Sequence, residues 1–68
     1  MNACFAERLR ELRLGKKIGQ IQLANEIGVS KGIISLWENG LREPTLSSLI
    51  LLSRYFCVSI DYLAGLSD

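Results

Sequence analysis

Residues 20–40 of this chain, QIQLANEIGVSKGIISLWENG, restrict its fold more than any other stretch. They contain two short segments in which apolar residues recur at helical spacing, and only residues 28–30 separate the two. Gly28 can end the first segment in the left-handed conformation, and the Ser30 hydroxyl can cap the second. Two short helices that are joined so closely meet at a steep angle, and the pattern therefore predicts a helix-turn-helix.

The rest of the chain is divided into segments of the same kind, each bounded by a cap or a helix stop. We expect a first helix over about residues 3–14, a second over 20–27, a third between Ser30 and Asn39-Gly40, a fourth between Thr45 and Phe56, and a fifth between Ser59 and Gly65. No segment alternates with a period of two for long enough to form a strand. The sequence therefore predicts an all-α fold with five helices in one domain, residues 1–68.

The apolar positions of these segments define the core that we expect. They are Phe5, Leu9 and Leu12, then Leu23, Ala24 and Ile27, then Ile34 and Trp37, then Leu46, Leu49, Ile50 and Phe56, and finally Ile60 and Leu63. Hydrophobic residues make up 49% of the chain, which argues against disorder. We expect Trp37 to belong to this core rather than to form an exposed stacking surface.

The charges are distributed unevenly although the net charge is only +1. Residues 1–42 carry seven basic and four acidic side chains, whereas residues 43–68 carry one basic and three acidic side chains. The basic part is expected to face an anion.

Several classes of protein are disfavoured by what the sequence lacks. It has no histidine, no pairing of a nucleophile with a base, and two distant cysteines, Cys4 and Cys57, so we expect no enzyme, no metal site and no cofactor. We interpret the cysteines as reduced thiols that act as small apolar residues, with a cross-link or a redox role as the alternative. No apolar run approaches the ~20 residues of a membrane span, and residues 1–10 do not resemble a signal peptide, so we expect a cytoplasmic location without a membrane partner.

From Phe5 to Leu63 the sequence resembles the phage-repressor-like (Cro and XRE-type) helix-turn-helix DNA-binding family. The matching stretches are FAERLRELR, QIQLANEIGVSKGIISLWENG, LREPTL and VSIDYL. The resemblance implies a five-helix lambda-repressor-like domain whose third helix enters the major groove of double-stranded DNA. It also implies a sequence-specific transcriptional regulator of the repressor type, without a small-molecule substrate. The alternative is a protein-interaction module with the same fold, such as an antitoxin or a sequestered regulator partner.

The resemblance places the DNA contacts on the second and third helices and in the loop that follows. The residues are Gln20, Ser30, Lys31, Gly32, Ile33, Ser35, Leu36, Asn39 and Arg42. Lys31 is expected to be the main polar reader of bases, whereas Leu36 can touch only a thymine methyl. Arg10, Lys16 and Lys17 are either further phosphate contacts or part of an exposed face.

Two more features follow from family positions. Arg13 and Glu38 are expected to form an ion pair that joins the first helix to the end of the third. Surplus apolar residues in the acidic half are expected either to be covered by the tail or to form the interface of a homodimer on a palindromic operator. These residues are Leu51, Tyr55, Tyr62 and Leu66.

Overall fold

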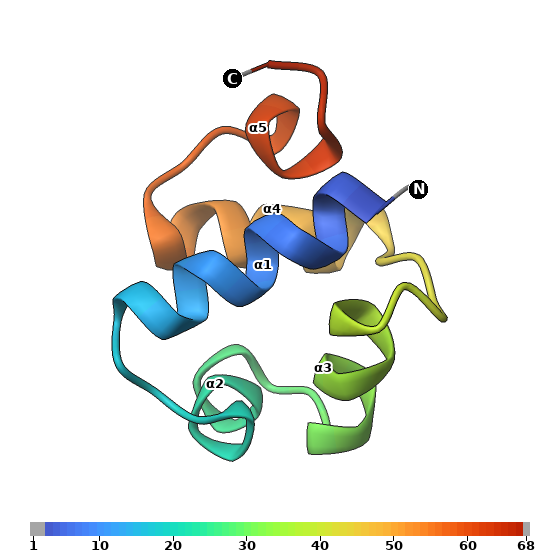
Figure 1. Ribbon diagram of the computed structural model, residues 1–68. Helices are drawn as coiled ribbons and strands as arrows, with labels where there is room; N and C mark the ends of the chain where they lie inside the picture. The colour runs from blue at the N-terminus through green and yellow to red at the C-terminus, as the bar shows by residue number, and fades with distance from the viewer. Residues whose placement is uncertain (1–2, 68) are drawn as a thin grey trace.

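The computed structural model describes residues 3–67, and every regular element in that range is an α-helix (Figure 1). The helices are α1 (Ala3–Gly15), α2 (Gln20–Ile27), α3 (Lys31–Glu38), α4 (Leu46–Phe56) and α5 (Ile60–Ala64). The all-α fold with five helices is therefore confirmed. In Figure 1, α2 and α3 lie together at one end of the molecule and α5 lies at the other, with α1 and α4 between them.

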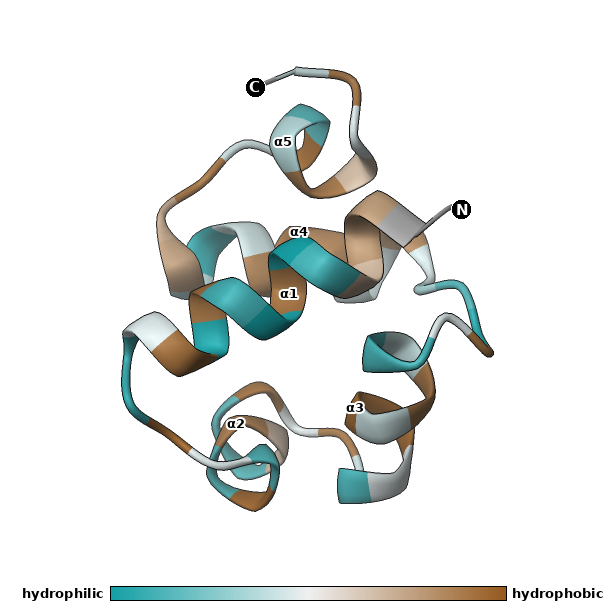
Figure 2. Cartoon of the chain, in the orientation of Figure 1, coloured by the Kyte–Doolittle hydropathy of each residue, from teal (hydrophilic) through white to brown (hydrophobic). Residues whose placement is uncertain are grey.

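One cluster of buried apolar side chains receives residues from all five helices. Its members are Phe5, Leu9, Leu23, Ala24, Ile27, Ile34, Trp37, Leu49, Leu52, Phe56 and Leu63. The Trp37 side chain is 2% exposed, and its ring meets the Phe5 ring edge to face with 6.2 Å between the centroids. Trp37 is therefore a core residue, as expected. The ribbon coloured by hydropathy shows the hydrophilic residues of α1 on the side of the helix that faces the viewer (Figure 2).

Three expectations about burial are wrong. Leu46 is 67% exposed, because it is the first residue of α4 and lies outside the contact that this helix makes with its neighbours. Leu52, which was not among the expected core residues, is fully buried, since it lies one turn from both Leu49 and Phe56. Both cysteines are reduced thiols, as expected, but Cys57 is exposed whereas Cys4 is half-buried, so Cys57 does not pack as a small apolar residue.

Serine and threonine caps set the beginnings of three helices. The hydroxyls of Ser30, Thr45 and Ser59 accept hydrogen bonds from backbone N–H groups three residues ahead, at 3.2, 3.1 and 2.9 Å. Each hydroxyl satisfies one N–H that the helix itself leaves without a partner. The predicted cap residues are therefore confirmed at all three positions.

All five helices end in the same way. Just past each end, one residue is left-handed, and the next residue donates its backbone N–H to the carbonyl five positions back, which is the Schellman arrangement. The left-handed residues are Lys17, Gly28, Gly40, Cys57 and Gly65. Lys17 and Cys57, at φ 58° and 56°, carry a Cβ in a conformation that favours glycine.

Replacing Lys17 with Gly should therefore stabilise the fold. We expect the free energy of unfolding to rise by about 0.5–1 kcal/mol, since the left-handed conformation costs other residues about 1–2 kcal/mol and glycine loses part of this gain to its greater chain entropy. This corresponds to an increase in Tm of a few degrees for a domain of this size. Lys17→Ala removes the same charge but keeps the Cβ, so a thermal scan in which both variants gain equally would contradict the backbone explanation.

Candidate nucleic-acid interface

The turn between α2 and α3 sets the position of α3. The backbone N–H groups of Gly28 and Val29 both donate to the Ala24 carbonyl, at 2.9 and 3.0 Å. Ala24 is 2% exposed at the point where the two helices approach each other. Its small side chain allows this approach, and Ser30 then begins α3 in a new direction. Residues 20–38 thus form a helix-turn-helix, as the sequence predicted.

The helix α3 has one packed side and one open side. Ile34 and Trp37 are buried, whereas Lys31 and Gly32 are exposed and Ser35 and Leu36 are partly exposed. Successive residues of an α-helix are rotated by about 100°, so these four exposed or partly exposed residues fall together on the side of α3 opposite the core. We call Lys31, Gly32, Ser35 and Leu36 the front of α3. It is narrow, apart from the Lys31 side chain, and the major groove admits a helix of this kind.

An ion pair connects α1 to the end of α3. The Arg13 guanidinium donates to both carboxylate oxygens of Glu38, at 2.7 and 3.0 Å, and its third nitrogen donates to the Ile18 carbonyl at 2.9 Å. Both side chains are largely buried, at 11% and 5% exposure. The hydrogen bond to Glu38, followed by the attraction of the carboxylate, raises the pKa of Arg13 against the opposing effect of burial. The expected Arg13–Glu38 pair is therefore confirmed.

Gln20 belongs to the same network, which sequence reasoning missed. Its side-chain amide nitrogen donates to Glu38 Oε1 at 3.3 Å. Because an amide carries two N–H groups, this bond leaves the second N–H available to another acceptor. Glu38 thus orients the first residue of α2 and, through Arg13, is itself held in place.

The hydrogen-bond donors at the end of α3 are used within the protein. Asn39 donates its side-chain amide to the carbonyl and the hydroxyl of Ser35, at 2.8 and 3.3 Å. The backbone N–H groups of Asn39, Gly40 and Leu41 donate to carbonyls of α3. A phosphate contact through Asn39 remains a prediction, and it would require its amide to change partners. Arg42 is exposed in the following loop.

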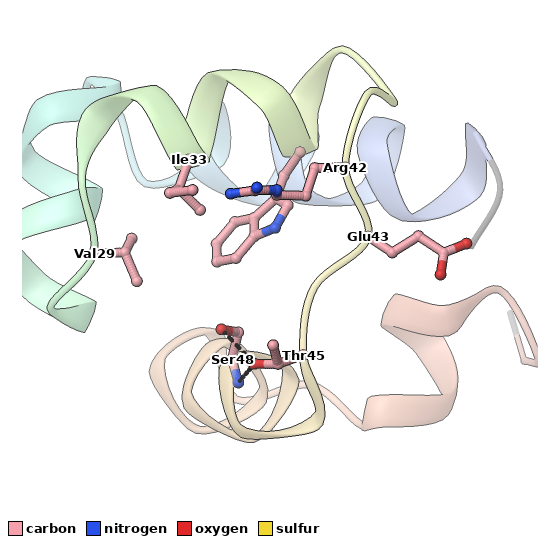
Figure 3. A pocket seen from close by; sticks show the side chains of 7 residues that line it. Val29, Ile33, Arg42, Glu43, Thr45 and Ser48 are labelled. Carbon is pink, nitrogen blue, oxygen red and sulfur yellow. Dashed lines mark hydrogen bonds between the residues drawn. The ribbon is translucent and has the colours of Figure 1, made fainter.

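A hollow of about 290 Å³ lies between α3 and the beginning of α4 (Figure 3). It is lined by Val29, Ile33, Trp37, Arg42, Glu43, Thr45 and Ser48. Figure 3 shows Val29 and Ile33 pointing into the hollow and the Arg42 side chain extending along one side of it toward Ile33. Ile33 also packs against the core, so it lies beside the front of α3 rather than on it. Its contact with DNA remains a prediction.

Residues 9–63 match the model of a family described as helix-turn-helix. The chain belongs to this helix-turn-helix family. The family consists of DNA-binding transcription regulators rather than enzymes. The fit to the phage-repressor pattern is confirmed by the relatives and the solved structures described next.

Relatives in the helix-turn-helix family are between 31% and 46% identical to this chain over the aligned residues. The HTH-type transcriptional regulator YobD of Bacillus subtilis is 39% identical over 94% of this chain, and the transcriptional activator BcrR of Enterococcus faecalis is 46% identical over 87%. The repressor protein C2 of Salmonella phage P22 is 42% identical over 87%. The chain spans only 57%, 29% and 27% of the lengths of these three proteins.

Two solved structures have the same fold. A crystal structure of the P22 c2 repressor protein in complex with a synthetic operator superposes with a TM-score of 0.89 and 36% identity, over 97% of this chain and 100% of that one. The solution structure of the DNA-binding domain of the same repressor gives a TM-score of 0.83 and 40% identity, over 98% of this chain and 92% of that one. These values show that the helix-turn-helix unit and the helices around it share the repressor arrangement.

Apolar side chains in the acidic half of the chain are also exposed. Leu51 on α4 and Leu66 after α5 are 44% and 79% exposed, so the chain up to residue 67 leaves Leu66 open to solvent. Tyr55 packs against the core, and Lys16 Nζ lies 4.5 Å from the centre of its ring. The four residues predicted for a dimer interface thus divide into two open leucines and two partly covered tyrosines.

Arg8 is a further contact that sequence reasoning missed. Its guanidinium lies 4.4 Å from the centre of the Tyr62 ring, and it donates to the carbonyls of Tyr62 and Ser67, the latter at 2.6 Å. It therefore ties α1 to α5 and to the end of the described chain. The only signal in the sequence was a basic residue on α1, which is also what a solvated helix face shows.

Residues 3–67 contain neither a cluster of metal-ligating side chains nor a helix that could span a membrane. Three or more histidine, cysteine or acidic side chains do not come together there to hold a metal ion. Within the same range, every helix is too short or too polar to cross a membrane.

Proposed function

We propose that residues 1–68 act as one DNA-binding domain of a sequence-specific transcriptional regulator of the repressor type, with α3 in the major groove. The observation that carries this proposal is the open front of α3 on a helix-turn-helix that superposes on a repressor in complex with its operator. A transcriptional regulator must reach the DNA that it binds, and we therefore propose a cytoplasmic location.

We assign the contacts by position and chemistry. Lys31 at the beginning of α3 reads a base edge, for which its ammonium suits the two acceptors of guanine. Gln20, Arg42 and the Ser30 hydroxyl contact phosphates, and Gln20 does so with the amide N–H that Glu38 leaves available. Ser35 and Leu36 face the bases one turn further along α3.

The Arg42→Ala variant tests the phosphate contacts. We expect weaker binding to all DNA sequences alike, and a slope of log K against log salt that is smaller by about one unit, since each neutralised phosphate releases about one counterion. Arg54→Ala is the matched control, because Arg54 is also exposed but lies on α4 in the acidic half. A slope that stays the same in Arg42→Ala, or falls equally in Arg54→Ala, would contradict the assignment.

Selection of a binding site from random DNA decides between the proposed function and the alternative, a protein-interaction module. A protein-interaction module with this fold is favoured by the low net charge of +1 and by the open leucines of the acidic half. Selection from random DNA, followed by titration of the selected site, should yield one preferred sequence. If no sequence is enriched over the starting pool, the DNA-binding proposal fails and the interaction module takes its place.

We also propose that the protein binds as a homodimer to a palindromic operator. One short helix covers only a few base pairs, and a two-fold dimer presents two such helices about 34–36 Å apart, one turn of the duplex. Leu51 and Leu66 supply open apolar surface for the contact, Tyr55 lies one turn after Leu51 on α4, and Tyr62 lies on α5 four residues before Leu66.

Leu66→Glu should weaken this dimer without harming the monomer. The side chain is 79% exposed, so a charge there costs the isolated fold little, whereas in an interface it would be buried without a partner. Sedimentation without DNA should show reduced self-association, and sedimentation with a palindromic site should show reduced cooperativity of DNA binding. Leu14→Glu is the control, because it makes the same change at another exposed leucine, on α1. Equal behaviour of the two variants would place the interface elsewhere.

A further inference from the structure

The hollow between α3 and the beginning of α4 lies beside the front of α3 and has an apolar lining. Val29 and Ile33 point into it and are only partly buried, and the core residue Trp37 also lines it (Figure 3). Apolar surface is thus left in contact with water, and a ligand with an apolar body would cover it. The volume of about 290 Å³ is at the lower end of the range for ligand pockets, so the hollow suits a molecule with one small ring or one branched chain.

The polar groups around the hollow favour an anion. Arg42 extends along one side of it, and within residues 3–67 its guanidinium has no ion-pair or hydrogen-bond partner. Glu43 also lines the hollow, but Figure 3 shows its carboxylate pointing away. On the opposite side, the Ser48 hydroxyl accepts a hydrogen bond from Thr45 at 3.0 Å, so its own hydrogen can be donated to a ligand. One guanidinium and one hydroxyl therefore surround an apolar lining.

We propose that this hollow binds a small carboxylate whose body is a single apolar ring or a branched chain, and that the bound carboxylate competes with DNA for Arg42. The competition rests on the proposed function, whereas the binding of the carboxylate does not. A planar carboxylate matches the guanidinium with two parallel hydrogen bonds, while its apolar body replaces water on Val29 and Ile33. A guanidinium that is held by the ligand cannot contact a phosphate, so the ligand weakens DNA binding.

The first test measures ligand binding without DNA. Trp37 is the single tryptophan of the chain and lines the hollow, so its fluorescence reports on an occupant. The probes are cyclohexanecarboxylate and isovalerate, for which we expect saturable changes with dissociation constants of about a millimolar, since ligands with so few atoms bind weakly. Their neutral counterparts, cyclohexylmethanol and isoamyl alcohol, should bind about tenfold less tightly, because they lack the charge-assisted hydrogen bonds. A response to neither carboxylate, or equal binding of carboxylates and alcohols, would overturn the proposal.

The second test fills the hollow from α4. Ser48→Leu places an apolar side chain in it, and Ser47→Leu is the matched control, because Ser47 is the exposed neighbour that does not line the hollow. Ser48→Leu should abolish the response to both carboxylates and Ser47→Leu should keep it, with thermal unfolding showing that both variants are folded. A wild-type response in Ser48→Leu would overturn the proposal. So would reduced self-association of Ser48→Leu together with no carboxylate response in wild type, which would indicate that a second copy fills the hollow.

Arg42→Met tests the charge without filling the hollow. Methionine keeps an apolar stem but cannot pair with a carboxylate, so the variant should bind each carboxylate and its alcohol with equal affinity. A preference for the carboxylate that persists in Arg42→Met would overturn the role of the guanidinium.

The third test adds the DNA site selected from random sequences. Saturating cyclohexanecarboxylate should weaken wild-type DNA binding by about the same factor as the Arg42→Ala substitution, and should have no further effect on Arg42→Ala. Acetate at the same concentration controls for ionic strength, and Ser48→Leu should be insensitive to the carboxylate. Unchanged DNA affinity with the hollow occupied would overturn the competition. If no DNA site is selected at all, the proposed function fails, and the fluorescence result decides the ligand site by itself.

Discussion

Replacing Arg13 with Met is expected to lower the free energy of unfolding by about 3–5 kcal/mol, the usual cost of breaking a buried ion pair from one side. The Glu38 carboxylate is 5% exposed, and among the side chains of residues 4–67 the donor that remains to it without Arg13 is Gln20, at the longer distance of 3.3 Å. The variant also loses the bond from Arg13 to the Ile18 carbonyl, which holds the turn before α2. Small domains have little stability to spare, so a large fraction of the variant should be unfolded at 37 °C.

Urea denaturation of the wild type and three variants measures this effect. Arg10→Met is the matched control on the same helix, because Arg10 is exposed, and it should change the free energy of unfolding by less than about 0.5 kcal/mol. The double variant Arg13→Met/Glu38→Leu should recover much of the loss, since no buried charge is left without a partner. A double variant that is less stable than Arg13→Met would contradict this account.

The pH dependence of the pair has a definite sign. Because the pKa of Arg13 is raised in the folded protein, its contribution to stability is complete below the unfolded-state pKa and is lost only as the pH rises through the folded-state value. Arginine therefore keeps its side of the pair charged throughout the neutral range.

Lys31→Ala is expected to weaken the free energy of DNA binding by about 1–3 kcal/mol at one base pair of each half-site. The preference for one base at that pair should be relaxed as well. Lys31 is exposed at the first position of α3, where its ammonium can reach a base edge while the short residues beside it let the helix approach. In a two-fold complex the loss occurs twice, so this variant should have the largest effect on binding of those considered.

Affinities for every single-base variant of the selected site show whether the loss is local. For Lys31→Ala we expect the penalty for the wrong base to disappear at one position and to persist at the others. Arg42→Ala supplies the contrast, because loss of a phosphate contact lowers all affinities by the same factor. If Lys31→Ala behaves in that uniform way, Lys31 contacts a phosphate and is not a reader of bases.

The helices could be predicted from the sequence because their signals are local. Ser30, Thr45 and Ser59 cap helices by bonding to N–H groups only three residues away, Gly28 is left-handed at the end of α2 as expected, and Gly65 ends α5 as expected. Cap chemistry and apolar spacing act within a few residues, so they do not depend on how the helices are arranged. The two short apolar segments on either side of residues 28–30 likewise sufficed to predict the helix-turn-helix, whereas its DNA contacts were expected from the resemblance to the phage-repressor family.

Contacts between elements were decided only by the tertiary structure. Leu46 and Leu52 are both apolar residues of α4, yet one is 67% exposed and the other is fully buried, because burial depends on which side of α4 its neighbours cover. Arg8 contacts Tyr62, 54 residues away, and Gln20 joins the pair of Arg13 and Glu38. Such contacts require the assembled helices, since a charged or amide side chain has the same local pattern whether it lies in water or reaches a partner far along the chain.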